Sequence, residues 1–325
     1  MLTTRFTKLV NCSVPIQQAG MGGLATPNLA AAVTNAGGLG MVSVYGCPLD
    51  EIIRTLDKTR AKTSGAIGAN FIMRFVDPTL AHESVAAAAA RAKVVDFFYT
   101  DPDPALIEIV HTAGSLACWQ IGSREEAIAA ADAGCDFIIA QGIEAGGHVR
   151  GRISLMALLS EVLEAVNVPV LAAGGIGTGR AMAAALAAGA DGVRVGTRFI
   201  AAEEAEAHPK YVQALIAAEA KDTVYTEVFT PNWPNAPHRV LRSSVEAVQA
   251  FTGEFVGEGV DTDTGERYPI RRFQGGTIRR STTGAIEAMP HWAGESVDGV
   301  KKLQPAAEIV NELAGDAEKL LRQWN

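Results

Sequence analysis

The chain has 325 residues, 48% of them hydrophobic, and its 28 Lys and Arg against 36 Asp and Glu give a formal net charge of −8 at pH 7. This acidic balance without a basic stripe argues against nucleic acid or an anionic membrane surface as the main partner, because binding to phosphate backbones needs clustered Lys and Arg. No apolar run of about 18 residues predicts a membrane-spanning helix. We therefore expect a small-molecule partner.

The four cysteines, at positions 12, 47, 118 and 135, show no Cys-x-x-Cys spacing. This pattern predicts reduced core residues, and neither a disulfide framework nor a zinc site. No basic segment followed by an apolar stretch opens the sequence. These features together predict a cytoplasmic protein.

Short apolar runs alternate with segments of helical periodicity through the first two thirds of the chain. The expected strands span residues 14–18, 39–44, 66–71, 94–99, 115–120, 136–141, 168–173 and 192–196. The expected helices between them span residues 28–35, 49–61, 79–91, 105–111, 124–133, 154–166 and 179–188. Eight strands in this alternation predict an α/β fold of the (β/α)8 TIM-barrel class, because that number closes the barrel, whereas an open doubly wound sheet requires no such count.

The alternation stops after about Lys221, where prolines and glycine-rich turns begin. We expect a barrel over residues 1–221 and a smaller cap over 222–300, folded over the strand ends. Residues 305–324 have apolar positions spaced as on one face of a helix. The segment 301–325 is therefore predicted to return to the barrel as a C-terminal helix.

Two glycine-rich segments follow the last two expected strands. They read Ala-Gly-Gly-Ile-Gly-Thr-Gly-Arg over residues 173–180, which include Gly174 and Gly175, and Gly-Val-Arg-Val-Gly-Thr-Arg over residues 192–198. Backbone amides without bulky side chains can approach a phosphate closely. In a (β/α)8 barrel the loops after strands seven and eight often bind phosphate. The sequence therefore predicts a phosphorylated ligand at this end of the barrel.

The loop after the first strand reads Gln-Gln-Ala-Gly-Met-Gly-Gly over residues 17–23, and its Gly20, Met21 and Gly22 would let a flat ring lie against backbone. A flavin needs a backbone amide near its N5 atom, and Gly22 is the candidate. An ordinary glycine turn has the same pattern. Asn70 and Gln120 end two other strands, where an amide either binds the polar edge of a ring or caps a loop.

The loop after the sixth strand reads Gln-Gly-Ile-Glu-Ala-Gly-Gly-His over residues 141–148. Histidine accepts and releases a proton near neutral pH, and Gly146 and Gly147 would let this loop press against a bound cofactor. This setting favours His148 as a general base over a surface histidine. Glu144 is predicted to orient His148, to bind a cofactor hydroxyl or to be solvated.

Other classes of site lack their motifs. The remaining histidines share no metal-ligand spacing, so no metal site is expected. The sequence also has no Gly-x-x-x-x-Gly-Lys-Ser/Thr loop, and no Gly-x-Gly-x-x-Gly follows the first strand. These absences argue against a nucleoside triphosphatase and against a Rossmann dinucleotide site.

Four motifs, over residues 15–21, 68–71, 141–148 and 192–199, occur in an order and spacing that resemble the nitronate monooxygenase family, formerly called 2-nitropropane dioxygenases. The resemblance implies an FMN-dependent (β/α)8 barrel that oxidises alkyl nitronates, such as propionate 3-nitronate, with molecular oxygen to a carbonyl compound and nitrite. It implies His148 as the catalytic base. The FMN contacts that it implies are Asn70, Gln141, Gly146, Gly175, Arg194, Val195, Gly196 and Thr197.

Other activities share parts of this pattern. NAD(P)H-dependent flavin reductases acting on quinones or enoyl-acyl carrier proteins have the same phosphate loops and a Gly-Gly-His turn, so fold and cofactor are more firmly predicted than reaction. A phosphate-binding barrel without flavin and a non-enzymatic flavin-binding protein are further alternatives. The sequence leaves a homodimer open.

Overall fold

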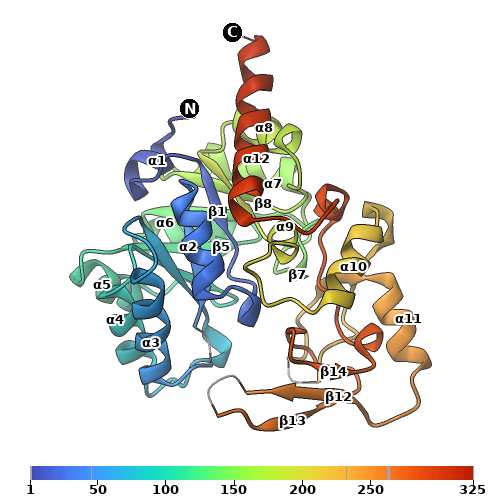
Figure 1. The fold of residues 1–325 in the computed structure, drawn as a ribbon. Coiled ribbons are helices and arrows are strands. Elements are labelled where there is room, and N and C mark those ends of the chain that lie inside the picture. The colour runs from blue at the N-terminus through green and yellow to red at the C-terminus, as the bar shows by residue number, and fades with distance from the viewer. Residues whose placement is uncertain (1, 45, 232, 262–263, 325) are drawn as a thin grey trace.

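Eight parallel strands form a closed ring in the computed structural model, which describes residues 2–44, 46–231, 233–261 and 264–324 (Figure 1). Around the ring, β1 is followed by β9, β8, β6, β5, β4, β3 and β2. Leu39, next to β2, exchanges backbone hydrogen bonds with β1: Gln18 N donates to Leu39 O over 3.0 Å and Leu39 N to Ile16 O over 2.8 Å. The predicted (β/α)8 barrel is confirmed. The strands are β1 (Ile16–Gln18), β2 (Gly40–Ser43), β3 (Ile67–Ile72), β4 (Val94–Phe98), β5 (Leu116–Ile121), β6 (Phe137–Gln141), β8 (Val170–Ala173) and β9 (Gly192–Val195).

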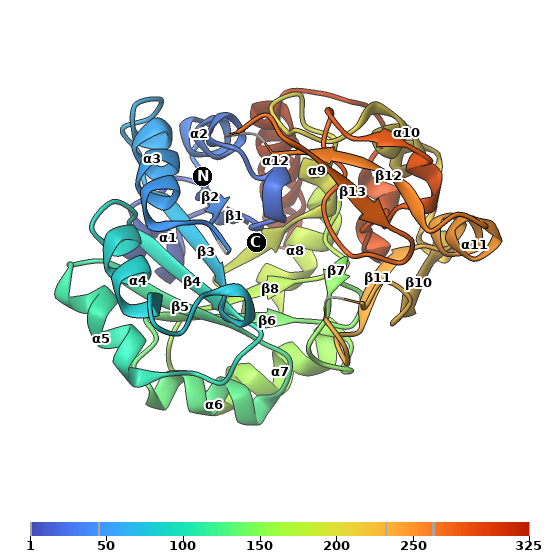
Figure 2. The ribbon, with the colours of Figure 1, turned by 90° about the horizontal axis from the view of Figure 1, so that it is seen from below.

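Helices surround this ring, as Figure 2 shows. Several begin at a residue whose side chain accepts a backbone hydrogen bond, such as Thr26, Ser123 and Thr178. They are α2 (Pro27–Asn35), α3 (Leu49–Arg60), α4 (Ala81–Ala89), α5 (Pro104–Thr112), α6 (Arg124–Asp132), α7 (Leu155–Ala165) and α8 (Gly179–Ala187). Their apolar faces pack on the strands in one large buried cluster.

A short helix, α1 (Arg5–Val10), was not expected from the sequence. Its Phe6 and Val10 are fully buried and pack with apolar side chains near the beginnings of several strands, including Phe137 at a ring-centroid distance of 5.3 Å. The helix therefore closes the end of the barrel at which the strands begin. The opposite end is left for a ligand.

The segment between Ala201 and Gln304, here called the cap, lies beside the ring (Figure 2). It follows the one-turn helix α9 (Thr197–Ile200), and its helices α10 (Pro209–Ala217) and α11 (Arg242–Ala250) share a second buried apolar cluster. One cap sheet contains β10 (Thr223–Thr226) and β11 (His238–Leu241), with β7 (Gly147–His148) as its third strand. The other contains β12 (Phe255–Val260), β13 (Arg267–Arg271) and β14 (Thr283–Gly284).

The last helix, α12 (Ala306–Leu321), packs against α8 and α2. Gly179 at the beginning of α8 permits α12 to approach closely, because a Cβ at that position would overlap the side chain of Asp316 on α12. The domain boundaries near residues 221 and 300 stay predictions. Within the described ranges, no helix has the length and apolar character needed to cross a bilayer.

Candidate active site

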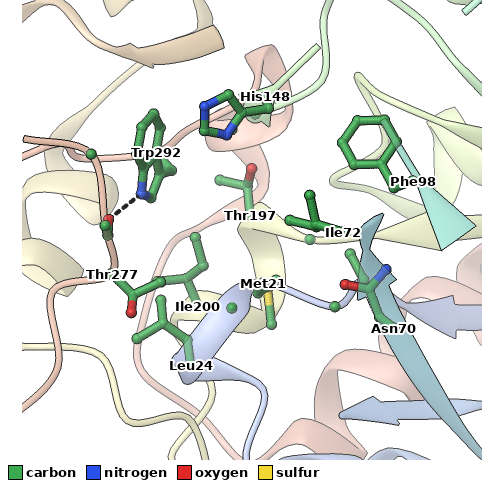
Figure 3. Close-up of a pocket in the computed structure, with 18 of the residues that line it drawn as sticks. Met21, Leu24, Asn70, Ile72, Phe98, His148, Thr197, Ile200, Thr277 and Trp292 are labelled. Atoms are coloured by element: carbon green, nitrogen blue, oxygen red, sulfur yellow. Dashed lines mark hydrogen bonds between the residues drawn. The ribbon is translucent and has the colours of Figure 1, made fainter. Parts of the chain in front are cut away.

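A cavity of about 370 Å³ lies between the carboxyl ends of the barrel strands and the cap. Figure 3 shows His148 and Trp292 facing it from one side and Met21 and Asn70 from the other. Its volume is within the range of small-molecule pockets. The predicted site residues among its lining are Gly20, Met21, Gly22, Asn70, Gln120, Gln141, Gly146, Gly147, His148, Arg194, Gly196 and Thr197.

The cap positions the loop that carries His148. Gly147 and His148 form β7, whose register partners on β11 are Arg239 and His238. Gln141 fixes the same loop from the barrel side: its Nε2 donates to the backbone oxygen of His148 over 3.0 Å. The backbone of His148 is therefore held by both the barrel and the cap.

The imidazole of His148 is packed among aromatic rings. It stacks on Trp233 at a centroid distance of 4.0 Å and an interplanar angle of 28°, with Trp292 at 5.3 Å. Its Nε2 atom is buried and has no hydrogen-bond partner among the described residues. Burial, reinforced by the nearby His238, lowers the pKa of His148 to about 3. The imidazole is therefore neutral at physiological pH.

A buried polar cluster lies under the cavity. The carboxylate of Asp96, which is fully buried, accepts from Asn70 Nδ2 over 2.7 Å and lies 2.7 Å from Nη1 of Arg194. Burial raises the pKa of Asp96, and the charge of Arg194 opposes that rise. The Asn70 side chain in turn covers Gly20, since a Cβ on Gly20 would overlap its amide. Asp96 thus holds the side chains of Asn70 and Arg194, two of the predicted cofactor contacts, in place.

The predicted phosphate loops are only partly at the cavity. Gly196 and Thr197 line it, whereas Gly174, Gly175 and Val195 are not part of its described lining. Gly174 and Gly175 have φ values of 107° and 67°, in the left-handed region that favours glycine. Thr197 Oγ1 accepts from the cap's Gly294 N over 3.0 Å.

Glu144, and Arg198 at the end of the second glycine-rich segment, have structural contacts. Both carboxylate oxygens of Glu144 accept from the backbone N of Leu155, at 3.1 and 3.0 Å, at the beginning of α7. Among the described residues, no hydrogen bond joins Glu144 to the His148 ring. Arg198 forms an ion pair with Glu312 of α12 and is not among the described lining of the cavity.

Sequence reasoning missed the aromatic wall of the cavity. Its members come from β4 and from the cap, and they include Phe98, Tyr211, Phe229, Trp233 and Trp292. One signal was present: Trp233 stands between two prolines in a segment without helical or strand periodicity. Within the described ranges, no group of three or more His, Cys, Asp or Glu is arranged to hold a metal ion.

The family sequence model described as "Nitronate monooxygenase" matches residues 3–316. The chain belongs to the nitronate monooxygenase family. This nitronate monooxygenase family member is 31% identical to "Probable nitronate monooxygenase" of Staphylococcus saprophyticus, over 95% of this chain and 96% of the relative. It is 35% identical to "(3aS,4S,5R,7aS)-5-hydroxy-7a-methyl-1-oxo-octahydro-1H-indene-4-carboxyl-CoA dehydrogenase" of Rhodococcus jostii, over 79% of this chain and 70% of the relative.

Two solved structures resemble the chain over nearly its whole length. FabK from Thermotoga maritima has a TM-score of 0.80 and 28% identity, covering 100% of this chain and 99% of that one. Nitroalkane oxidase from Streptomyces ansochromogenes has a TM-score of 0.76 and 29% identity, covering 98% and 99%. This member of the nitronate monooxygenase family is an oxidoreductase, and its family is flavin-dependent.

Proposed function

We propose that this protein oxidises alkyl nitronates with molecular oxygen, that FMN is its cofactor and that His148 is its general base. The observation that carries the proposal is the buried, neutral imidazole of His148, whose Nε2 has no hydrogen-bond partner among the described residues. A general base must be unprotonated and within reach of its substrate. The substrate would be a nitronate or a nitroalkane, with oxygen as the second reactant.

The cavity fits a flavin. The first loop lines the cavity with Gly20, Met21 and Gly22, and Met21 and Gly22 have φ values of 34° and 55°. Asn70, Gln120 and Arg194 supply polar atoms for the edge of a ring. We propose that FMN is held by Gly20, Met21, Gly22, Asn70, Gln120, Gln141, Gly146, Gly147, Gly174, Gly175, Arg194, Val195, Gly196 and Thr197.

His148 would act on a neutral nitroalkane at the carbon next to the nitro group. The C–H bond breaks, the proton passes to the imidazole, and the electron pair moves into the nitro group to give the nitronate. When bound, FMN would supply the electron acceptor for the nitronate and the centre that reacts with oxygen.

The test is the variant His148→Asn with two forms of one substrate. A neutral nitroalkane needs the base, whereas a preformed nitronate has already lost its proton. We expect kcat/KM for the nitroalkane to fall about 10²- to 10⁴-fold and that for the nitronate to fall far less. Equal losses on both substrates would exclude His148 as the base.

A second candidate is an NAD(P)H-dependent flavin reductase. The full-length similarity to FabK and the 35% identity to a carboxyl-CoA dehydrogenase favour it. Anaerobic mixing of the flavin-loaded protein with NADH and with NADPH separates the two proposals. Rapid bleaching of the flavin by either nucleotide supports the reductase, and no bleaching removes it.

A further inference from the structure

The cavity has a polar side and an apolar side, and they come from different parts of the chain. The barrel strands contribute polar side chains, namely Asn70, Gln120, Gln141 and Arg194. The cap contributes four aromatic side chains and a glycine-rich segment. They are Tyr211, Phe229, Trp233, Trp292 and residues 275–277. A substrate lying against the cap therefore meets mainly hydrocarbon.

Trp292 and Tyr211 use their polar atoms within the cap. Trp292 Nε1 donates to Gly276 O over 2.6 Å, as the dashed line in Figure 3 shows, and Tyr211 OH donates to Trp292 O over 2.5 Å. Trp233 packs edge-on against Phe75, at a centroid distance of 4.9 Å. Because the donors of Trp292 and Tyr211 are already paired, these two rings present carbon surfaces to the cavity.

Charge in the cavity is balanced. Arg194 is the one Arg or Lys in its described lining, and it is paired with the fully buried Asp96. His148 is neutral at physiological pH. A carboxylate on the part of the substrate that lies against the cap would lose its hydration and find no Arg or Lys in the described cap lining.

We infer that the cap selects nitro compounds with an uncharged apolar substituent, aryl groups included, and disfavours those with a carboxylate, propionate 3-nitronate among them. This inference rests on the proposed function. It assigns Trp292, which reaches the cavity from the cap, as a specificity-determining residue. The aromatic faces would contact the substituent, and the nitro-bearing carbon would lie toward His148.

A matched pair of substrates tests the charge preference. 3-Nitropropionate and 3-methyl-1-nitrobutane differ by a carboxylate in place of an isopropyl group, so their sizes are similar. We expect kcat/KM with oxygen to be at least about a hundredfold higher for 3-methyl-1-nitrobutane, because the carboxylate would be buried unpaired. The same ratio is expected whether the nitro forms or the nitronate forms are supplied. Equal or higher values for the carboxylate would overturn the inference.

Binding of the same two compounds distinguishes a failure of the apolar preference from a failure of the proposed function. Each compound is titrated into the flavin-loaded protein without oxygen, and the change in flavin absorbance gives its Kd. If no nitronate consumes oxygen, the proposed function fails. Tighter binding of 3-methyl-1-nitrobutane would still support the apolar preference, and tighter or equal binding of 3-nitropropionate would contradict it.

Variants of Trp292 test the aromatic wall. In Trp292→Leu, the ratio of kcat/KM for 1-nitro-2-phenylethane over 3-methyl-1-nitrobutane should fall about two- to tenfold, because a ring-to-ring contact is lost. Trp292→Phe, which retains a ring, should preserve the ratio. The control Phe255→Leu changes an exposed cap residue outside this cavity and should also preserve it. An unchanged ratio in Trp292→Leu would remove Trp292 from this role.

Discussion

His148 and Trp233 are stacked at a centroid distance of 4.0 Å, although one follows a barrel strand and the other belongs to the cap. The contact desolvates the imidazole on one face, and burial is the main reason for its lowered pKa. The protonation state of the proposed base therefore depends on a residue more than eighty positions away in the sequence.

The buried histidines predict a loss of stability in mild acid. His291 is buried, its Nε2 lies 3.1 Å from Ile286 O, and burial lowers its pKa to about 4. Between pH 7 and 5 the unfolded chain binds a proton at this residue and the folded chain does not, so the free energy of unfolding falls as pH falls. His291 alone should contribute a loss of about 2 kcal/mol at pH 5.

Urea unfolding of the wild type and of His291→Gln at pH 7 and pH 5 measures this contribution. The variant should lose about 2 kcal/mol less than the wild type between the two pH values. The difference between the proteins is informative because His148 and His238, whose pKa values are also lowered, remain in both. An identical pH dependence would mean that His291 titrates normally in the folded protein.

Asp96→Asn should destabilise the protein strongly. The substitution leaves the buried guanidinium of Arg194 without its ion-pair partner, which typically costs about 3–5 kcal/mol. It also replaces with an amide the carboxylate that accepts the hydrogen bond from Asn70 Nδ2. Urea unfolding gives the change in free energy.

The control is Asp50→Asn, which breaks the exposed pair between Asp50 and Arg54 and should change stability by less than about 1 kcal/mol. If Asp96→Asn were as mild as this control, the Asp96–Arg194 pair would not be the buried charge pair described above.

Two adjacent glycines should respond differently to alanine. A Cβ on Gly146 would overlap the backbone nitrogen of Gly294, whereas a Cβ on Gly147 would meet nothing within 4 Å. Gly147 has a φ of 73°, so Gly147→Ala should cost about 1–2 kcal/mol of backbone strain. Gly146 has no such positive φ, but Gly146→Ala must move the cap backbone at Ala293 and Gly294, whose Gly294 N donates to Thr197 Oγ1.

Flavin titration followed by fluorescence quenching compares these variants. Gly146→Ala should weaken flavin binding by at least about tenfold, because a displacement of this size misplaces contacting groups. Gly147→Ala should bind more tightly than Gly146→Ala. The reverse order would show that the contact between Gly146 and Gly294 does not shape the site.

The sequence was sufficient to predict the barrel because each strand is a short apolar run bounded by glycine or polar turns. It also indicated which loops reach the cavity, since all eight strands end at the same face. Asp96 was overlooked although a carboxylate inside an apolar run is itself a signal. Its partner Arg194 lies on β9, which is not adjacent to β4 in the sheet, so the pairing becomes visible only when the barrel closes.

The aromatic wall was beyond sequence reasoning for a different reason. Phe229 and Trp233 are close in the sequence but far from Trp292, and the segment has no regular periodicity. Trp233 and Trp292 meet only around the His148 ring, and Phe229 packs on Trp292. Glu144 was misjudged in part because its partner, the nitrogen of Leu155, is a backbone atom with no side-chain signature.

The pairing of β7 with β11 has a consequence for protein engineering. Arg239, next to His238 on β11, donates from Nε and Nη2 to the backbone oxygen of Ile143, each over 3.1 Å, and so ties the barrel loop to the cap a second time. A chimera that took its cap from another family member would replace both attachments at once. New substrate preferences are therefore better sought by exchanging single side chains of the cap than by transplanting the whole cap.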